Sequence, residues 1–192
     1  GSIGDFGCFS FFPGKNLGAY GDAGCITTNS RKFYKKILEL RNIGAFNLAN
    51  KSDCRDLGIN SRLDTLQAIV LNQKLKRLGH LTQKRKSISK RYSKEISNPK
   101  IKKLDYEAGS VYHQYVIKTH NRKKLLNYLK KKKIEYGIHY PISINKLRLL
   151  KNKIKKKFFN AERLAKQCVS LPVDPSLRYE QITRIIKNIN SY

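Results

Sequence analysis

The stretch from residue 6 to residue 22 reads FGCFSFFPGKNLGAYGD, and the rest of the chain is organised around it. Alternating apolar residues end at Pro13-Gly14, and a single lysine, Lys15, follows before a glycine pair, Gly18 and Gly21, that allows a tight turn. Aromatic and apolar neighbours desolvate an ammonium group, which favours the neutral amine that can attack a carbonyl carbon. The pattern therefore indicates Schiff-base chemistry at Lys15 rather than a solvated surface charge.

Length and composition indicate a globular protein. The 192 residues, 40% of them hydrophobic, suffice for one domain of ordinary size, or a domain with an appendage, around a real core. The sequence contains no run of about 18 uncharged apolar residues and no charged-then-apolar leader, so we expect a soluble, cytoplasmic protein without a membrane span. Because methionine is absent even from position 1, we expect the chain to be a piece of a longer product.

The cysteines and histidines do not form a recognisable metal or disulfide pattern. The four cysteines (Cys8, Cys25, Cys54, Cys168) contain no Cys-x-x-Cys pair, and no histidine lies near them at a zinc-ligand spacing. We therefore expect neither a structural metal nor disulfides, and we interpret the cysteines as reduced, buried or half-buried thiols.

The net charge of +28 raises the alternative of a nucleic-acid-binding module. Only 8 of the 41 basic residues lie in positions 1–60, and the other 33 follow in 61–192. The excess is mostly lysine and accompanies many isoleucines and asparagines, which indicates a compositional bias as much as a binding surface. Aromatic residues fall in predicted strands and motifs rather than within the basic runs, so nucleic acid is the less favoured partner.

The first part of the chain reads as two strands and a helix. Residues 3–11 and 24–28 have strand character on either side of the glycine turn. Ser30 can cap a helix whose apolar positions recur at helical spacing until Gly44 ends it. Residues 45–58 are polar and aperiodic, which predicts a loop.

A long amphipathic helix is predicted next. In GINSRLDTLQAIVLNQKL, Ser61 and Asp64 have the spacing of a capping box ahead of an apolar run that keeps near-helical spacing to Ile96. We expect a bend at Gly79 and an end before Pro99. The length of this helix indicates that residues 61–98 connect two subdomains, residues 1–60 and residues 99–192.

The second part alternates short strands and helices. The sequence predicts a strand at 111–118, a basic helix at 123–133, a strand or strand-loop at 134–141, a helix at 161–167, the extended segment SLPVDP and a last helix at 180–189. This order is typical of a small α+β domain.

Several motifs of the sequence resemble those of one protein family and occur in the same order. They are GSIGDFGCFSFFPGKNLGAYGDAG, LRNIG, GINSRLDTLQAIVL, YHQYVI, GIHYP and SLPVDP. Over essentially all 192 residues the chain resembles the C-terminal half of the DegT/DnrJ/EryC1/StrS family of PLP-dependent sugar aminotransferases. The resemblance implies an α/β, fold-type-I architecture: the end of the large-domain sheet (1–60), a connecting helix (61–98) and a small α+β C-terminal domain (99–192).

The resemblance implies roles for particular residues around pyridoxal 5′-phosphate. Lys15 corresponds to the lysine that holds the cofactor and moves the substrate proton, and Ser10 to the hydroxyl that binds the cofactor phosphate. Asn60 corresponds to a residue that reaches the phosphate in the neighbouring subunit, which implies a homodimer with shared sites. Arg62 beside it can bind an acidic group or form a salt bridge, and the sequence leaves this open.

His139 and Tyr140, in GIHYP, match residues on the substrate side of the family's pocket, where they can bond sugar hydroxyls or phosphate. Taken alone, such a His-Tyr-Pro is more often structural, and we expect His113 and Tyr115 to be core residues. The implied function is transfer of an amino group from an amino-acid donor, expected to be glutamate, to a nucleotide-linked keto sugar in glycan or polysaccharide biosynthesis.

Three parts of the family's site are not found in these 192 residues: the phosphate-cupping turn, the aromatic ring that stacks on the cofactor, and the aspartate that pairs with its ring nitrogen. We therefore expect the 192-residue chain alone to have little or no transaminase activity. Besides the nucleic-acid-binding module, a non-catalytic dimerising remnant is a further alternative.

Overall fold

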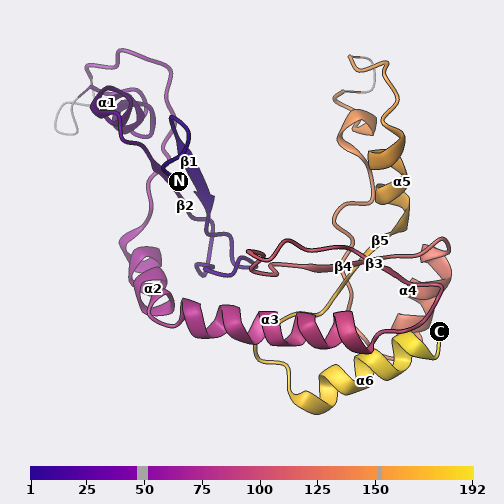
Figure 1. Cartoon of the computed structure of the whole chain (residues 1–192). Helices are drawn as coiled ribbons and strands as arrows, with labels where there is room; N and C mark the ends of the chain where they lie inside the picture. The colour runs from indigo at the N-terminus through magenta and orange to yellow at the C-terminus, as the bar shows by residue number, and fades with distance from the viewer. Residues whose placement is uncertain (47–51, 151–152) are drawn as a thin grey trace. The chain divides into compact units, whose positions relative to one another are not determined.

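The computed structural model describes residues 1–46, 52–150 and 153–192. These residues divide into two compact units, unit 1 (Gly1–Gly79) and unit 2 (His80–Tyr192), each of which can be followed by colour in Figure 1. The predicted loop at 45–58 lies partly outside the described residues. The three-part division at 60 and 98 stays a prediction.

Unit 1 begins with a β-hairpin. Strands β1 (Gly7–Ser10) and β2 (Gly24–Thr27) pair antiparallel, with Cys8 opposite Ile26 and Phe9 opposite Cys25. Both predicted strands are confirmed, although they are shorter than expected. Every residue of β2 is exposed, and in β1 only Gly7 is buried. Most hairpin residues are therefore exposed within this unit, and neither strand pairs with a third one in the described residues.

Helix α1 (Arg31–Leu40) has the ends that the sequence predicts. The Ser30 hydroxyl oxygen accepts a hydrogen bond from the Phe33 N–H at 3.3 Å, and the Gly44 N–H donates to the Glu39 carbonyl at 2.9 Å. No residue of α1 is buried, in spite of its apolar stripe. Unit 1 therefore only half-buries the side of α1 that its sequence pattern marks as apolar, for example where Phe33 packs against Phe6 at 4.8 Å between ring centres.

The predicted connector is helical, but it is two helices. They are α2 (Thr65–Leu75) and α3 (Leu78–Glu95), separated where the Arg77 N–H donates to the Lys74 carbonyl in a tight turn. Gly79, the expected bend, lies in the first turn of α3. The prediction of a capping box at Ser61 and Asp64 was wrong. Asp64 is the residue before α2, and its side chain forms no cap hydrogen bond. The Ser61 N–H donates to the Arg41 carbonyl instead.

The sheet of unit 2 has three antiparallel strands in the order β3 (Lys102–Lys103), β4 (Tyr115–Lys118) and β5 (Cys168–Leu171). Tyr115 lies opposite Leu171 and Lys118 opposite Cys168. The strand predicted at 111–118 begins only at Tyr115, because Tyr112 has a φ of 46°, which a strand does not accommodate. The segment 134–141 is a loop with one bridge, from Gly137 to Ser170.

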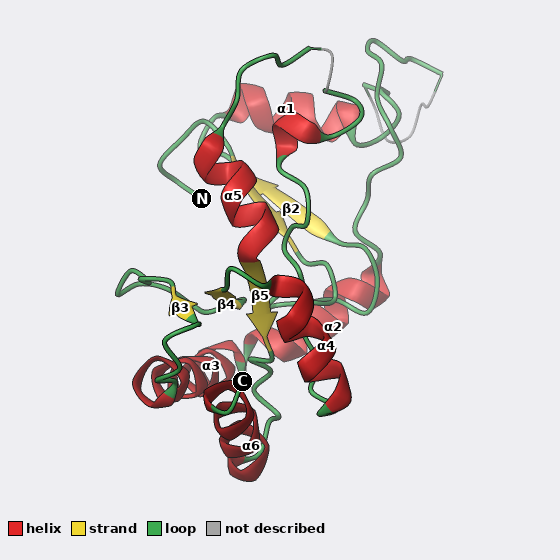
Figure 2. Ribbon diagram, turned by 90° about the vertical axis from the view of Figure 1, so that its right-hand side faces the viewer, coloured by secondary structure: helices red, strands yellow, loops and turns green. Residues whose placement is uncertain are grey.

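Four helical segments complete unit 2: α4 (Arg122–Lys131), the short η1 (Ile144–Lys146), α5 (Phe159–Gln167) and α6 (Tyr179–Asn190). The three longer ones confirm the predicted helices. Figure 2 shows α3 and α6 beside each other, and α5 running directly into β5. Apolar side chains from α3, β4, α4, β5 and α6 form one core, whose members include Tyr92, Ile117, Leu125, Val169 and Ile189.

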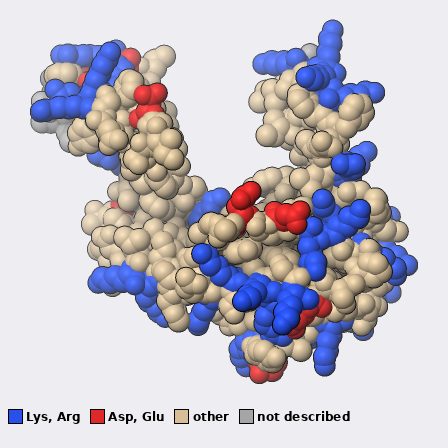
Figure 3. Space-filling model, viewed as in Figure 1, with Lys and Arg blue, Asp and Glu red and all other residues tan. Residues whose placement is uncertain are grey.

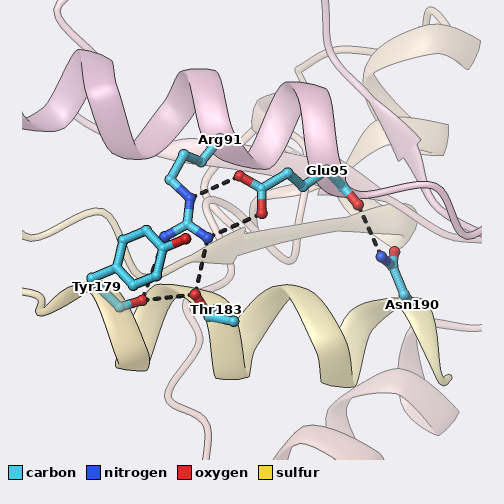
Figure 4. A network of polar contacts seen from close by, with 5 residues as sticks. All are labelled: Arg91, Glu95, Tyr179, Thr183 and Asn190. Carbon is cyan, nitrogen blue, oxygen red and sulfur yellow. Dashed lines mark hydrogen bonds and ion pairs between the residues drawn. The ribbon is translucent and has the colours of Figure 1, made fainter.

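A polar network fixes α6 to α3 (Figure 4). The Arg91 guanidinium donates to both carboxylate oxygens of Glu95, at 2.7 and 3.0 Å, and to the Thr183 hydroxyl at 2.9 Å. It also lies 4.1 Å from the centre of the Tyr179 ring, and the Asn190 amide donates to the Glu95 carbonyl at 2.9 Å. These contacts set the register of the two helices beside the core.

All four cysteines are free thiols, but the predicted burial holds only for Cys168. Cys8, Cys25 and Cys54 are exposed, because the two strands and the loop that carry them are uncovered within unit 1. Over the ranges that the structure describes, no group of three or more His, Cys, Asp or Glu side chains could hold a metal ion. In the same ranges, no helix combines the length and the apolar character needed to cross a membrane.

Candidate active site

Lys15 lies in a turn directly after β1. The turn closes through two backbone hydrogen bonds, from the Lys15 N–H to the Phe12 carbonyl and from the Ala19 N–H to the Phe11 carbonyl, each 2.8 Å long. A Cβ at Gly18 would lie 2.3 Å from the Pro13 carbonyl oxygen, so only glycine fits there. Lys15 is half-buried, and no carboxylate among the described residues forms an ion pair with its ammonium group.

Helix α2 braces this turn. The Gln67 side-chain oxygen accepts from the Tyr20 N–H at 2.8 Å, and the Lys74 ammonium donates to the Gly18 carbonyl at 2.7 Å. The same ammonium lies 4.3 Å from the centre of the Tyr20 ring. Helix α2 therefore holds the backbone that follows Lys15, at Gly18 and at Tyr20.

Ser10, the last residue of β1, is exposed. Its hydroxyl oxygen accepts a hydrogen bond from the Phe12 N–H at 3.3 Å. A hydroxyl that accepts one bond can still donate its own proton. Ser10 can therefore donate to an anion next to the segment that leads into the Lys15 turn.

Asn60 and Arg62 lie together in the extended segment before α2. The Arg62 Nε donates to the Asn60 side-chain oxygen at 3.1 Å, and Asn60 also forms a backbone bridge with Asn42. No carboxylate in the described part of the chain pairs with Arg62, so the choice between an acidic ligand and a salt bridge stays open.

A groove of about 1240 Å³ runs along this segment. Asn60 and Arg62 line it together with Arg41, residues of both hairpin strands and residues of α1. Ser10 and Lys15 are not among the lining residues. Within unit 1 the structure thus brings Asn60 and Arg62 together in the groove, and it places Ser10 and Lys15 along one strand-turn outside it.

His139 and Tyr140 belong to unit 2 and line a pocket of about 430 Å³. Most of the other lining side chains are apolar and come from residues 142–145, which include the start of η1, and from α5, with Phe158 and Cys168 beside them. The Tyr140 side chain is 71% exposed, while the His139 Nδ1 lies 2.9 Å from the Ser170 hydroxyl. The expectation that Tyr115 is a core residue is confirmed, whereas His113 is only half-buried.

Comparison with known proteins decides the family. The model of the DegT/DnrJ/EryC1/StrS aminotransferase family matches residues 1–190. The chain belongs to this family. The predicted fold class is confirmed as well, since a DegT/DnrJ/EryC1/StrS aminotransferase from Brucella abortus superposes with a TM-score of 0.90 at 31% identity, covering 100% of this chain and 52% of that one.

Two further relatives extend the comparison. UDP-N-acetyl-3-dehydro-alpha-D-glucosamine 3-aminotransferase of Acidithiobacillus ferrooxidans is 35% identical over 187 residues, which are 96% of this chain and 50% of that protein. The NtdA structure from Bacillus subtilis, solved with bound cofactor PMP, matches with a TM-score of 0.86 at 25% identity and covers 96% of this chain and 45% of that one. This family member therefore spans about half the length of the curated relatives that it matches.

Sequence reasoning missed several residues that hold the candidate site together. Gln67 and Lys74 brace the Lys15 turn, Arg41 lines the groove beside Arg62, and Ser170 contacts His139. Ser170 opens the SLPVDP motif, so the motif marked its position without indicating its partner. The others follow no local pattern, because their contacts depend on how the segments of each unit fold together.

Proposed function

We propose that this chain is the lysine-bearing half of a PLP-dependent sugar aminotransferase. The observation that carries the proposal is the Lys15 turn: a half-buried lysine without an ion-pair partner in the described residues, braced by α2, in a chain of this aminotransferase family. Such a lysine is available for covalent chemistry at its amine.

The side chains present fit the proposed cofactor. The Lys15 amine suits an aldehyde, and the Ser10 hydroxyl and the Asn60 amide suit a phosphate ester. When bound, pyridoxal 5′-phosphate supplies an aldehyde and a ring that stabilises negative charge on the substrate carbon. Lys15 would hold the group covalently, be released when the amino donor arrives, and then carry the proton to and from the substrate carbon as general acid and base.

The substrate proposed is a nucleotide-linked keto sugar, with glutamate as the amino donor, in glycan or polysaccharide biosynthesis. The name of the Acidithiobacillus relative describes a UDP-linked 3-dehydro sugar, which is a keto sugar of this class. His139 and Tyr140, which line one pocket, would bind hydroxyl or phosphate groups of the sugar, and Arg62, which lines the groove, would bind an acidic group or form a salt bridge.

The other half of the site would come from a polypeptide equivalent to the rest of the relatives' length, joined to this chain or separate. Two observations support this: most hairpin residues are exposed and no residue of α1 is fully buried within unit 1, and the chain spans about half of its relatives. A two-stranded hairpin is seldom stable without further strands or a packed helix. We expect the complementary half to add them.

Covalent trapping tests the role of Lys15 directly. The 192-residue chain is incubated with limiting pyridoxal 5′-phosphate, reduced with borohydride and mapped by peptide mass spectrometry. We expect the phosphopyridoxyl label to concentrate on Lys15 and to disappear in Lys15→Ala. Lys32→Ala, which removes a lysine from exposed α1, is the matched control and should leave the Lys15 label unchanged. A label spread evenly over the many lysines would contradict the proposal.

Activity is then measured with the other half present, for example the N-terminal half of the Acidithiobacillus relative expressed in trans. We expect transfer from glutamate to a UDP-linked keto sugar, and loss of at least about 1,000-fold in Lys15→Ala, since covalent and acid-base roles are both removed. A trapped label without turnover in any such combination would favour the non-catalytic remnant.

The shared-site role of Asn60 needs a separate experiment. In mixtures of Lys15→Ala and Asn60→Ala subunits, a dimer with shared sites would contain one site with both changes and one with neither. We expect each variant alone to be impaired and the mixture to regain part of the activity. If each site is built from one subunit, mixing restores nothing.

Apart from the net charge of +28, no feature of the described residues favours the nucleic-acid-binding alternative. On the face that Figure 3 shows, Lys and Arg side chains are scattered over both units instead of forming one stripe. That alternative predicts DNA or RNA affinity that falls steeply with salt, together with no specific Lys15 label.

A further inference from the structure

His139 is held from several sides by its own unit. Its Nδ1 lies 2.9 Å from the hydroxyl of Ser170, which is 6% exposed. The ring of Tyr140 meets the imidazole edge-on, with centroids 5.5 Å apart and an angle of 85°. His139 is exposed, yet one of its ring nitrogens, Nδ1, already has a hydrogen-bonding partner.

Gly137 makes room for this ring. Gly137 and Ser170 exchange two backbone hydrogen bonds, of 3.0 and 2.8 Å, so they are directly opposite in an antiparallel bridge. Side chains of directly opposite residues project on the same face. Because Gly137 has no side chain, the imidazole occupies that face, and a Cβ there would lie 2.4 Å from His139 Cε1 and 3.1 Å from Nδ1.

We propose that Ser170 and Gly137 are positioning residues that fix the His139 imidazole, with Nδ1 bound to the Ser170 hydroxyl and Nε2 left as the one ring nitrogen for substrate. The proposal deepens the proposed function and rests on it for the identity of the ligand, a hydroxyl or phosphate group of the sugar nucleotide. The partner of one ring nitrogen determines which tautomer the other presents. Ser170 would therefore set the hydrogen-bonding character of Nε2.

The two positions can be changed in complementary ways. Ser170→Ala removes the hydrogen-bonding partner and leaves the space above Gly137 as it is. Gly137→Ala keeps the Ser170 hydroxyl and the backbone bridge but moves the ring, since His139 can rotate away from the new methyl group. Ser170→Thr retains the hydroxyl and should keep the His139 ring in its original orientation. Ser89→Ala removes another buried hydroxyl of unit 2, far along α3 from this motif in sequence and without a partner in the described residues, and is the matched control.

The ring is observed by nitrogen NMR of the 192-residue chain with labelled histidine, and His139→Gln identifies the signals. In the unsubstituted chain we expect a single tautomer of the neutral ring, and titration with UDP as the probe should shift Nε2 and leave Nδ1 nearly unchanged. Ser170→Ala and Gly137→Ala should give averaged tautomers, while Ser170→Thr and Ser89→Ala should match the unsubstituted chain. Averaged tautomers before any substitution, or an unchanged spectrum in Ser170→Ala, would overturn the proposal.

Kinetics of the enzyme reconstituted with its other half separate this proposal from the proposed function. Loss of one positioning hydrogen bond should raise KM for the keto sugar about 3- to 10-fold in Ser170→Ala, with Lys15 labelling unchanged. If the enzyme turns over normally and KM does not rise, the positioning role is wrong and the aminotransferase proposal stands. If no turnover is found, the NMR spectra and the UDP titration still decide whether Ser170 orients His139.

Discussion

Units 1 and 2 bury apolar side chains to very different extents. In unit 2 one continuous core joins three helices and two strands, and Tyr115, Ile117, Leu125 and Val169 are completely buried. Among the described residues of unit 1, the buried hydrophobic residues are only Ala19, Ala45 and Leu71. Hydrophobic burial is the largest favourable term in folding, so unit 2 carries most of the stability that this chain can supply.

The difference separates the residues of the candidate site into a well-packed unit and a poorly packed one. The proposed cofactor residues Ser10, Lys15 and Asn60 all lie in unit 1, where backbone turns and a few side-chain hydrogen bonds hold them. His139 lies in unit 2, beside the packed strand β5. Completion of unit 1 by further polypeptide would therefore matter for turnover at the proposed site more than for the folding of unit 2.

Hydrogen exchange should show the largest effect. We expect the amides of β4 and β5 to exchange about 1,000-fold or more slowly than those of β1 and β2, because opening the former requires unfolding of a core worth several kcal/mol. Residue-resolved exchange by NMR measures both sets in one sample. Equal protection of the two pairs of strands would mean that unit 1 is stabilised by something other than its own burial.

Truncating one isoleucine in each unit should give the next largest effect. Ile117 in β4 is 0% exposed and Ile26 in β2 is 50% exposed. Ile117→Ala should lower the free energy of unfolding by about 2–5 kcal/mol, through lost burial and a residual cavity. Ile26→Ala, the matched control, should change it by less than about 0.5 kcal/mol. Urea unfolding followed by circular dichroism measures both, and similar losses would contradict the comparison.

Much of this architecture could be predicted from the sequence, because it depends on local chemistry. The Ser30 cap, the helices α4, α5 and α6 and the extended start of SLPVDP, which belongs to β5, follow from spacing and capping residues. β3, with two lysines, has no apolar alternation to reveal it. The break between α2 and α3 was expected only as a bend at Gly79, because the apolar periodicity continues through it; it lies between Leu75 and Leu78, where the Arg77 N–H bonds to the Lys74 carbonyl.

The candidate site also contains residues that local sequence could indicate and residues that it could not. Lys15 could be singled out from its strand-turn setting, whereas Ser10, Asn60 and His139 were identified only by resemblance, and their roles stay predictions. The exposure of Cys8 and Cys25 was not foreseen, since the sequence shows which residues are apolar without showing what covers them. Contacts between distant segments, such as His139 with Ser170, follow no local rule.

Removing one N-cap from each unit should have a smaller effect. Ser30 caps α1 in unit 1, and Asn121 caps α4 in unit 2, where its side-chain oxygen accepts from the Lys124 N–H at 3.1 Å. Asn121→Ala should lower the free energy of unfolding of unit 2 by about 1 kcal/mol. Ser30→Ala should leave that value unchanged and only increase amide exchange in α1. A shift of the global transition by Ser30→Ala would show that the units unfold together.

The smallest effect should be a pH dependence at the Arg91–Glu95 pair. The hydrogen bond from the Arg91 guanidinium lowers the pKa of the Glu95 carboxyl below its ordinary value. A carboxyl whose pKa is lower in the folded state binds protons more weakly there, so its stabilising contribution is complete above the unfolded pKa and disappears as pH falls through the folded one. Between about pH 5 and pH 3, the unsubstituted chain should therefore lose slightly more stability than Glu95→Gln, measured as the urea midpoint. Because this ion pair is solvated, we expect only a small difference. No difference would show that Arg91 serves unit 2 through Thr183 and the Tyr179 ring alone, and a reversed sign would show that folding raises the pKa of Glu95.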